Sequence, residues 1–243
     1  MTLPRLTCKI GTDPEVFLRD KETKQIISAV DKFPGTKDFP YPLDRGALQV
    51  DGHALEFNTE PVSSENEFVE VVSHVFGQVK QFVEATHPHL EITLQPVARF
   101  DASYFANLPE YSKMLGCNPD YSAQTGKELS APDITNVPIR TGSGHIHIGW
   151  TNDEDPFDEA NFKKRFILAN RITPYLLKAA KAWETPESDA RRIYYGREGA
   201  FRPKPYGVEL RALDNLWLES PERMLSVFRA AKNGFEQEYH YAS

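Results

Sequence analysis

The stretch TGSGHIHIGW, residues 141–150, places His145 and His147 two positions apart between glycines and isoleucines. Side chains along a β-strand alternate between its two faces. The two histidines therefore share one face with Gly149, and the isoleucines lie on the other. Half-buried strands commonly show polar residues to water. The meaning of this pair therefore depends on the residues that stand beside it.

Three other segments repeat the alternation, with ionisable side chains on one face and apolar side chains on the other. Carboxylates gathered on one face repel each other unless cations sit among them. Carboxylate oxygens with one imidazole suit Mg²⁺ or Mn²⁺. The pattern therefore favours a metal site. The segments are TDPEVFL (12–18), with Asp13 and Glu15, ALEFNTE (54–60), with Glu56 and then Glu60, and GVELRAL (207–213), with Glu209 and Arg211.

The composition is that of a cytoplasmic globular protein. The chain has 243 residues, 40% of them hydrophobic, which suits a single domain over residues 1–243. A formal net charge of −7 argues against nucleic acid as a main partner. Cys8 and Cys117 predict no disulfide framework and a reducing compartment. The sequence lacks a signal-peptide core and any apolar run near the roughly 20 residues that cross a bilayer, so no membrane partner is expected.

Three helical regions are predicted. Ser64 and Glu67 form a candidate capping box before apolar residues at helical spacing. A second region spans about 158–183, where Pro174 should kink or divide the helix. The last helix is expected to begin after Ser220 as N-cap, with proline at its first position.

Short strands are expected between these helices. Segments 8–18 and 24–30 could pair, and 47–58 contains a hairpin signal at Asp51-Gly52. Residues 96–143 show no clear period and are interpreted as a long, functional loop region. Residues 191–215 are expected to be loop and strand. The fold class is therefore α+β, with a mostly antiparallel sheet and helices packed on one face.

The acidic and histidine segments resemble, in the same order, those of one superfamily. GTDPEVFL (11–18) resembles the first acidic strand of glutamine synthetases and glutamate–cysteine ligases. GSGHIHIG (142–149) is similar to their HxH strand, and GVELRALDN (207–215) to their ExR strand. LGCNPDYSA (115–123) and GAFRPKPYGVELRALDNLWL (199–218) resemble the small phage-encoded carboxylate–amine ligases of this superfamily. The resemblance covers about residues 8–218, and for a phage protein the compartment is the host cytoplasm.

This resemblance implies a fold and a reaction. The sheet would be curved, with helices on its convex face and with ATP and two or three Mg²⁺ or Mn²⁺ ions on its concave face. A substrate carboxylate would attack the γ-phosphate of ATP, and an amine substrate would displace phosphate from the acyl phosphate to give an amide. The protein would position groups and neutralise charge. Neither substrate can be named from the sequence, which also leaves open whether the chain forms a homo-oligomer.

The resemblance also implies roles for single residues. Asp13 and Glu15 match paired acids that bind two different ions, although Asp13 stands where the family usually has the longer Glu. His145 matches a metal ligand, and His147 the histidine nearer the nucleotide. The other carried-over positions are Glu209 as metal-binding and catalytic acid, Arg211 as stabiliser of the transferring phosphoryl group, Glu56 as further metal-binding acid with Glu60 as second choice, and Arg202, Lys204, Arg140 and Arg197 as ATP-binding cations.

Two other function classes stay open from the sequence. A metal-dependent hydrolase or oxygenase could use the HxH pair, but the cupin version needs a Glu shortly after it, and the next acid is Asp153. A non-catalytic binding protein could keep the ligase fold. Cys117 and the histidines outside the HxH pair are interpreted as structural or surface residues.

Overall fold

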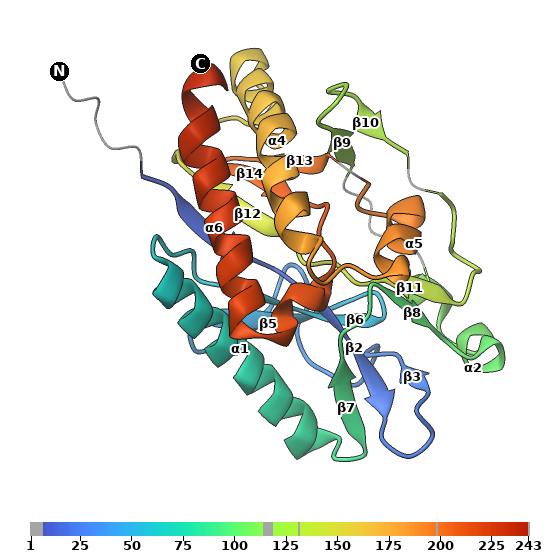
Figure 1. Cartoon of the computed structure of the whole chain (residues 1–243). Helices are drawn as coiled ribbons and strands as arrows, with labels where there is room; N and C mark the ends of the chain where they lie inside the picture. Colours follow the sequence, from blue (N-terminus) through green and yellow to red (C-terminus); the bar gives the residue numbers. More distant parts are fainter. Residues whose placement is uncertain (1–6, 114–118, 131, 198, 243) are drawn as a thin grey trace.

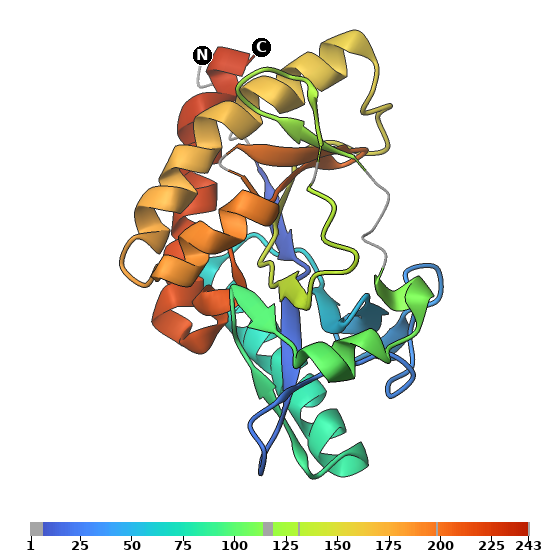
Figure 2. The same cartoon turned by 90° about the vertical axis from the view of Figure 1, so that its right-hand side faces the viewer.

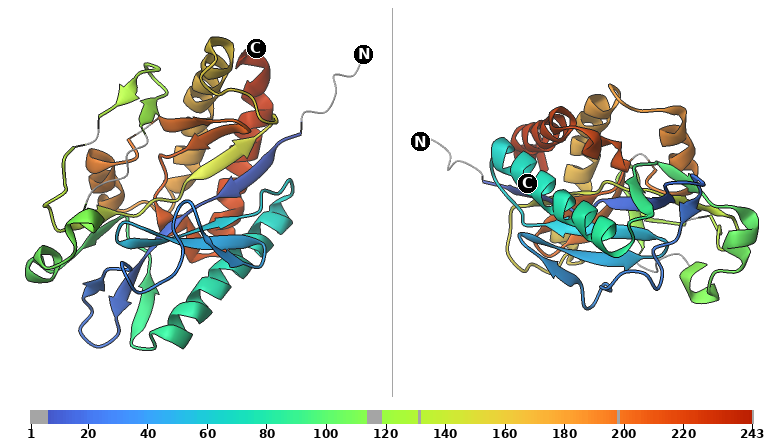
Figure 3. Two further views of the ribbon diagram at one scale, coloured as in Figure 1. Left: turned by 180° about the vertical axis from the view of Figure 1, so that it is seen from behind. Right: turned by 90° about the horizontal axis from the view of Figure 1, so that it is seen from below.

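The chain folds into two curled antiparallel sheets with helices packed against them (Figure 1). The computed structural model describes residues 7–113, 119–130, 132–197 and 199–242. Within these residues the architecture is α+β and forms a half-barrel, which confirms the predicted fold class. Seen from behind in Figure 3, the strands lie in front of the long helices.

The first sheet contains the HxH strand between the edge strand and the ExR strand. Ile146 and Ile148 of that strand are fully buried, as are their partners Leu210 and Val208 on the next strand. The histidines of the strand therefore point to the other face. In spatial order the strands are β1 (Lys9–Thr12), β12 (Ile146–Gly149), β14 (Gly207–Leu210), β13 (Ala200–Lys204), β9 (Asp120–Ser122) and β10 (Glu128–Leu129).

The second sheet contains the predicted hairpin, which the structure confirms as a pair of strands joined by a turn at Gly52-His53, directly after Asp51. Gly52 has a φ of +55°, in the left-handed region that favours glycine. The strands are β3 (Ile26–Ile27), β2 (Glu15–Asp20), β6 (Ala54–Thr59), β5 (Gly46–Asp51) and β4 (Tyr41–Leu43), with β7 (Leu90–Thr93) also pairing with β2, while β8 (Val97–Arg99) and β11 (Ile139–Thr141) form a separate ribbon.

Three long helices cover the sheets. The helix α1 (Glu65–Thr86) packs on the second sheet, α4 (Glu159–Ala180) packs on β13 and β14, and α6 (Pro221–Glu238) contacts both helices. Figure 2 shows α4 and α6 side by side along the molecule. The shorter helices are α2 (Ala102–Ala106), α3 (Glu110–Lys113), α5 (Pro186–Tyr194), and the 3₁₀ helices η1 (Asn215–Glu219) and η2 (Tyr239–Ala242).

The helix starts were predicted well from local sequence. Ser64 is the N-cap of α1 and accepts a hydrogen bond from the Glu67 N–H, and Ser220 caps α6. Pro174 lies inside α4, which continues to its end at residue 180, so the proline does not divide the helix. Ile172 and Leu176 on either side of it are fully buried, and this packing offsets the missing backbone hydrogen bond.

Two parts of the chain hold more regular structure than expected. Residues 96–143 contain β8, α2, α3, β9, β10 and β11. These elements are two to five residues long, too short to show a period in the sequence. The helix α5 includes residues 191–194, which were expected to be loop or strand. Its exposed Ile193 obscures the helical pattern.

The chain passes from the first sheet to the second at Asp13-Pro14. Thr12, the last residue of β1, pairs with Ile146, and its hydroxyl donates a hydrogen bond to the His145 carbonyl, 2.7 Å away. Three residues later, Glu15 begins β2 in the second sheet. This short connection, here called the seam, therefore places one acid at each of the two sheets.

Candidate metal and nucleotide site

A first group of possible metal ligands lies on the first-sheet side of the seam. One ligand atom each from Asp13, His147 and Glu209 lies within 4.8 Å of the others. His147 on β12 and Glu209 on β14 are direct cross-strand partners. Because cross-strand partners share a face, the antiparallel register brings the HxH and ExR motifs together.

His145 borders the same group from deeper in the sheet. Its Nδ1 lies 3.2 Å from an oxygen of Asp13 and 3.6 Å from an oxygen of Glu209. Its Nε2 is buried without a hydrogen-bond partner among the described residues. His147 contacts Asp13 through Nε2 at 2.8 Å and the Tyr206 hydroxyl through Nδ1. Both histidines therefore contact Asp13, and the geometry does not separate their predicted roles.

The protonation of this group follows from its burial and its neighbours. Burial raises the pKa of Asp13, but the charges and hydrogen bonds of His147 and His145 outweigh it and hold the pKa well below its ordinary value. Burial lowers the pKa of His147, and the Asp13 charge outweighs this and raises it. Burial and the Arg211 charge lower the pKa of His145 to about 3. A neutral His145 imidazole keeps a nitrogen lone pair, as a metal ligand requires.

Three cations from β13 and the end of β14 surround Glu209. Lys204 Nζ lies 2.7 Å from Oε2 of Glu209, and Arg211 and Arg202 approach Oε1, the latter at 3.7 Å. Asp120 on β9 lies 2.9 Å from Nε of both arginines. The first group thus has positive charges in direct contact with its acids.

A second group lies on the other side of the seam. Ligand oxygens of Glu15, Asp51 and Glu56 lie within 4.8 Å of one another. Glu15 and Glu56 are cross-strand partners, and Asp51 ends the neighbouring strand of the hairpin. In the described part of the chain no Lys or Arg forms an ion pair with any of the three. Among the residues that the structure describes, this group, unlike the first, therefore has no Lys or Arg in an ion pair.

The carboxyl groups of the second group have raised pKa values. Burial and the nearby Asp51 charge raise the pKa of Glu15 to about 7. Burial and the charges of Asp13 and Asp51 raise the pKa of Glu56 well above its ordinary value. Clustered buried carboxylates become favourable as anions only when a cation is bound among them.

Hydrogen bonds from Ser143, just before the HxH strand, and from Asn215 fix the position of Glu15. The Ser143 N–H donates to Oε2 of Glu15 at 2.9 Å, and the Asn215 side-chain amide donates to the Glu15 carbonyl at 2.8 Å. The buried Arg191 donates to the Ser143 hydroxyl at 2.9 Å. A Cβ on Gly144 would lie 2.2 Å from the Trp217 Nε1, so this close approach requires glycine. We call these donors, Ser143 and Asn215, the Glu15 clamp.

Both groups have the donor types that divalent ions use. Carboxylate oxygens suit Mg²⁺ or Mn²⁺, and an imidazole beside them favours Mn²⁺ or a similar borderline ion. The raised pKa values of Glu15 and Glu56 fit a cation bound in the second group. The neutral His145 imidazole, whose Nδ1 faces Asp13 and Glu209, fits a cation bound in the first. Asp13, His147, His145 and Glu209 would hold one ion, and Glu15, Asp51 and Glu56 a second.

Three residues proposed from the sequence lie outside these groups. Glu60 is exposed and pairs with Arg45 at 3.2 Å. Arg197 is exposed in the turn before β13. The Arg140 guanidinium is buried and donates hydrogen bonds to backbone carbonyls only. These are the carbonyls of Lys113, Ile134, Val137 and Ile139.

The sequence did not identify three residues of the site. Asp51 was interpreted only as part of a turn signal, and Tyr206 was not considered. Asp120 lies in the stretch LGCNPDYSA, to which no role in the site was assigned from the sequence. The residues that they contact lie on strands that are distant in the sequence, and the alternation of side chains along a single strand does not predict such contacts. Cys117 lies outside the described residues.

The comparisons leave the family open. No family model matches this chain, and no curated protein shows significant sequence similarity to it. No helix in the described residues is long and apolar enough to span a membrane.

Proposed function

We propose that this protein is an ATP-dependent carboxylate–amine ligase that works with two divalent ions, Mg²⁺ or Mn²⁺. The observation that carries the proposal is the arrangement at the seam. Two groups of metal-ligand side chains stand side by side, and three cations line the strands next to one of them. The resemblance of the three strand motifs to ligases of the glutamine synthetase superfamily agrees with this arrangement.

Arg202, Lys204 and Arg211 are suited to hold the phosphates of ATP. All three contact Glu209, so they converge on one point. Guanidinium and ammonium groups form strong charge-assisted hydrogen bonds with phosphate oxygens. Because Asp120 contacts both arginines, it would keep them oriented. Divalent ions would supply further neutralisation of phosphate charge when bound.

The proposed reaction is the one that the resemblance implies, and this placement of charge supports it. An oxygen of the substrate carboxylate attacks the γ-phosphorus, and the bond to the bridging oxygen breaks to release ADP. The amine nitrogen then attacks the acyl carbon, phosphate leaves with the C–O bond pair, and the nitrogen loses a proton. Arg211 and its neighbours would stabilise the negative charge on the transferring phosphoryl group. The substrates belong to the carboxylate and amine classes.

A matched pair of variants tests the proposal. ADP release is measured over a panel of carboxylate and amine pairs with Mg²⁺ or Mn²⁺, and the amide is identified by mass. Glu56→Gln, in the second group, should lower turnover by about 100-fold or more, since a metal ligand is lost. Glu60→Gln, four positions away and paired with Arg45 on the surface, should keep the wild-type rate.

Other outcomes would support the remaining classes. Metal-dependent hydrolysis of an ester or amide without ATP would support a hydrolase. Binding of Mg²⁺–ATP without turnover over the whole panel would support a non-catalytic binding protein. Equal activity of Glu56→Gln and the wild type would refute the assignment of the second group.

A further inference from the structure

A cavity of about 530 Å³ lies apart from the two acidic groups. The end of β2, the link between β7 and β8, the start of α5 and η1 form its walls. None of the residues of the two groups lines it. Its volume lies within the roughly 300–1,000 Å³ of typical small-molecule sites.

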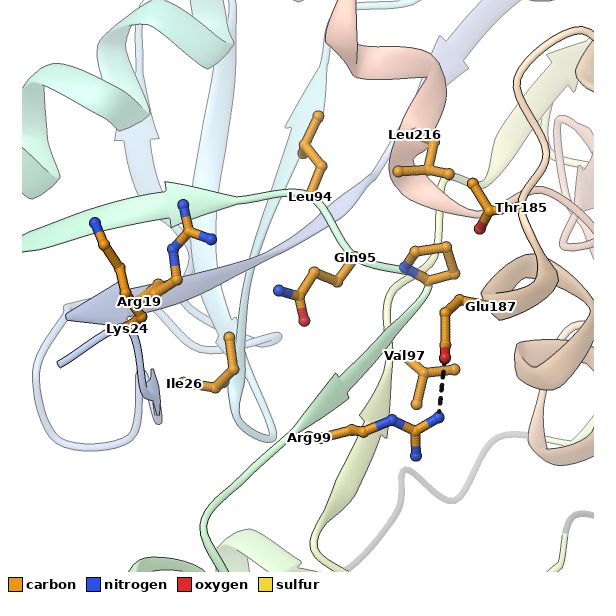
Figure 4. A pocket seen from close by; sticks show the side chains of 11 residues that line it. Arg19, Lys24, Ile26, Leu94, Gln95, Val97, Arg99, Thr185, Glu187 and Leu216 are labelled. Carbon is orange, nitrogen blue, oxygen red and sulfur yellow. Dashed lines mark hydrogen bonds and ion pairs between the residues drawn. The ribbon is translucent and has the colours of Figure 1, made fainter. Parts of the chain in front are cut away.

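The cavity has an apolar wall between two cationic sides. Leu94, Val97 and Leu216 line the wall. In Figure 4, Arg19 lies on one side of the cavity next to Lys24, and Arg99 lies on the opposite side. This arrangement suits a ligand with an acidic group at each end and an apolar spacer.

The two guanidinium groups in the cavity have N–H donors beyond those that their ion pairs use. Arg19 donates through Nε to Glu91, and Arg99 donates through Nη2 to Glu187. A guanidinium carries five N–H donors and forms paired bonds with carboxylates. The Gln95 amide points into the middle of the cavity (Figure 4). Three cations and one acid line the cavity, and Glu91 beside it pairs with both Arg19 and Lys24. The guanidinium N–H groups of Arg19 and Arg99 that no ion pair among the described residues uses are therefore the donors that an anion would meet.

We propose that this cavity binds a small dicarboxylate and that the ligand acts as an effector of the ion site. One carboxylate lies on the terminal N–H groups of Arg19, whose Nε already pairs with Glu91, and the other lies on Arg99. The spacer packs on Leu94 and Leu216, and Gln95 donates to the ligand between its two ends.

The walls of the cavity connect directly to the Glu15 clamp. The Pro96 carbonyl, in the cavity wall, accepts a hydrogen bond from the Gly142 N–H at 2.9 Å, next to Ser143. Leu216, also in the wall, follows Asn215. Asn215 is therefore adjacent to a residue of the cavity wall, and Ser143 follows Gly142, which is hydrogen-bonded to another. A ligand that shifts these segments changes the position of Glu15, and with it the affinity of the second group for its ion.

Calorimetric titration of the metal-free protein with adipate tests the binding. Adipate should bind about tenfold more tightly than hexanoate, which has one carboxylate, and than neutral adipamide. An acidic peptide offers the same chemistry, so acetyl-Glu-Leu-Glu-amide is titrated in parallel to distinguish a peptide end from a free dicarboxylate. Arg99→Gln should weaken the tighter ligand by about tenfold.

Arg229→Gln is the matched control. Arg229 forms an ion pair with Glu65 and is 55% exposed, as Arg99 with Glu187 is 59% exposed, and Arg229 lies on α6 away from the cavity. This variant should bind adipate as the wild type does. If neither adipate nor the peptide binds, or if Arg99→Gln and Arg229→Gln bind alike, the site is refuted.

Mn²⁺ titration followed by electron paramagnetic resonance tests the effector role. Saturating adipate should change the Mn²⁺ affinity of the wild type about threefold or more. Arg99→Gln in the same solution should show no change, which controls for Mn²⁺ taken up by adipate itself. Binding of adipate with an unchanged Mn²⁺ affinity would overturn the effector role. These measurements need no ligase turnover, so their failure is distinct from failure of the proposed function.

Discussion

Replacement of Glu15 by Gln should remove a pH-dependent loss of stability in the metal-free protein. The pKa of Glu15 is raised from its ordinary 4.5 to about 7. Between these values the folded state keeps the proton and the unfolded state has lost it. Stability that is present below pH 4.5 is therefore lost as the pH rises through 7. The loss is about 3 kcal/mol, because a tenfold change in proton affinity corresponds to about 1.4 kcal/mol.

Urea unfolding in EDTA at pH 5, 6, 7 and 8, followed by tryptophan fluorescence, measures the effect. His53 and His145 have pKa values lowered to about 4 and 3, so they make stability rise with pH in the acid part of the range. Both remain in Glu15→Gln, and the difference between the two proteins removes their contribution. That difference also includes the response of Glu56, whose pKa the Glu15 charge helps to raise.

The expected result is a gain of stability in Glu15→Gln, relative to the wild type, that grows between pH 5 and 8. Added Mn²⁺ should stabilise the wild type most at pH 8, where the ion binds the ionised carboxylates. Parallel stability curves for the two proteins over this range would refute the raised pKa. They would also remove the electrostatic argument for an ion in the second group.

Three further perturbations test other parts of the structure. Asp120→Asn removes the charge between Arg202 and Arg211 and should lower ligase turnover about 10- to 100-fold, measured as ADP release; an unchanged rate would show that the arginines need no such partner. Arg140→Met removes buried hydrogen bonds to backbone carbonyls and should cost about 2 kcal/mol or more in urea unfolding, with unchanged ATP affinity by calorimetry. A fall in ATP affinity would instead support the role expected from the sequence. Gly144→Ala places a Cβ 2.3 Å from the Asp214 carbonyl and should cost about 1–3 kcal/mol; a wild-type unfolding midpoint would contradict this.

Features that depend on neighbouring residues were predicted from the sequence. The N-caps at Ser64 and Ser220 and the hairpin at Asp51-Gly52 each follow from a few adjacent residues, and the structure confirms them. The alternation of side chains along each strand also placed His147 on the polar face of its strand and Glu209 on the polar face of its own. Their pairing across β12 and β14 needed the register of two distant segments.

Features that depend on burial or on a change of sheet were not predicted. The sequence gives no reason to separate Arg140 from Arg202, yet one donates to a backbone loop and the other contacts Glu209. The sequence around Asp51 indicates a turn, whereas the structure places its carboxylate in a group of possible metal ligands. This placement arises only because the seam carries Glu15 beside the hairpin. Contacts between distant segments decide such positions, and local patterns do not contain them.

The two acidic groups differ in how much of the chain must be synthesised before they exist. Asp51 and Glu56 belong to one hairpin close to Glu15 in the sequence, whereas Asp13 and His145 are 132 positions apart. Contacts over such separations form slowly, because a long loop must close first. On the ribosome, the hairpin acids can gather while the HxH and ExR strands are still unmade. We therefore expect the group of Asp13, His147 and Glu209 to form after the hairpin group, when β14 joins the first sheet.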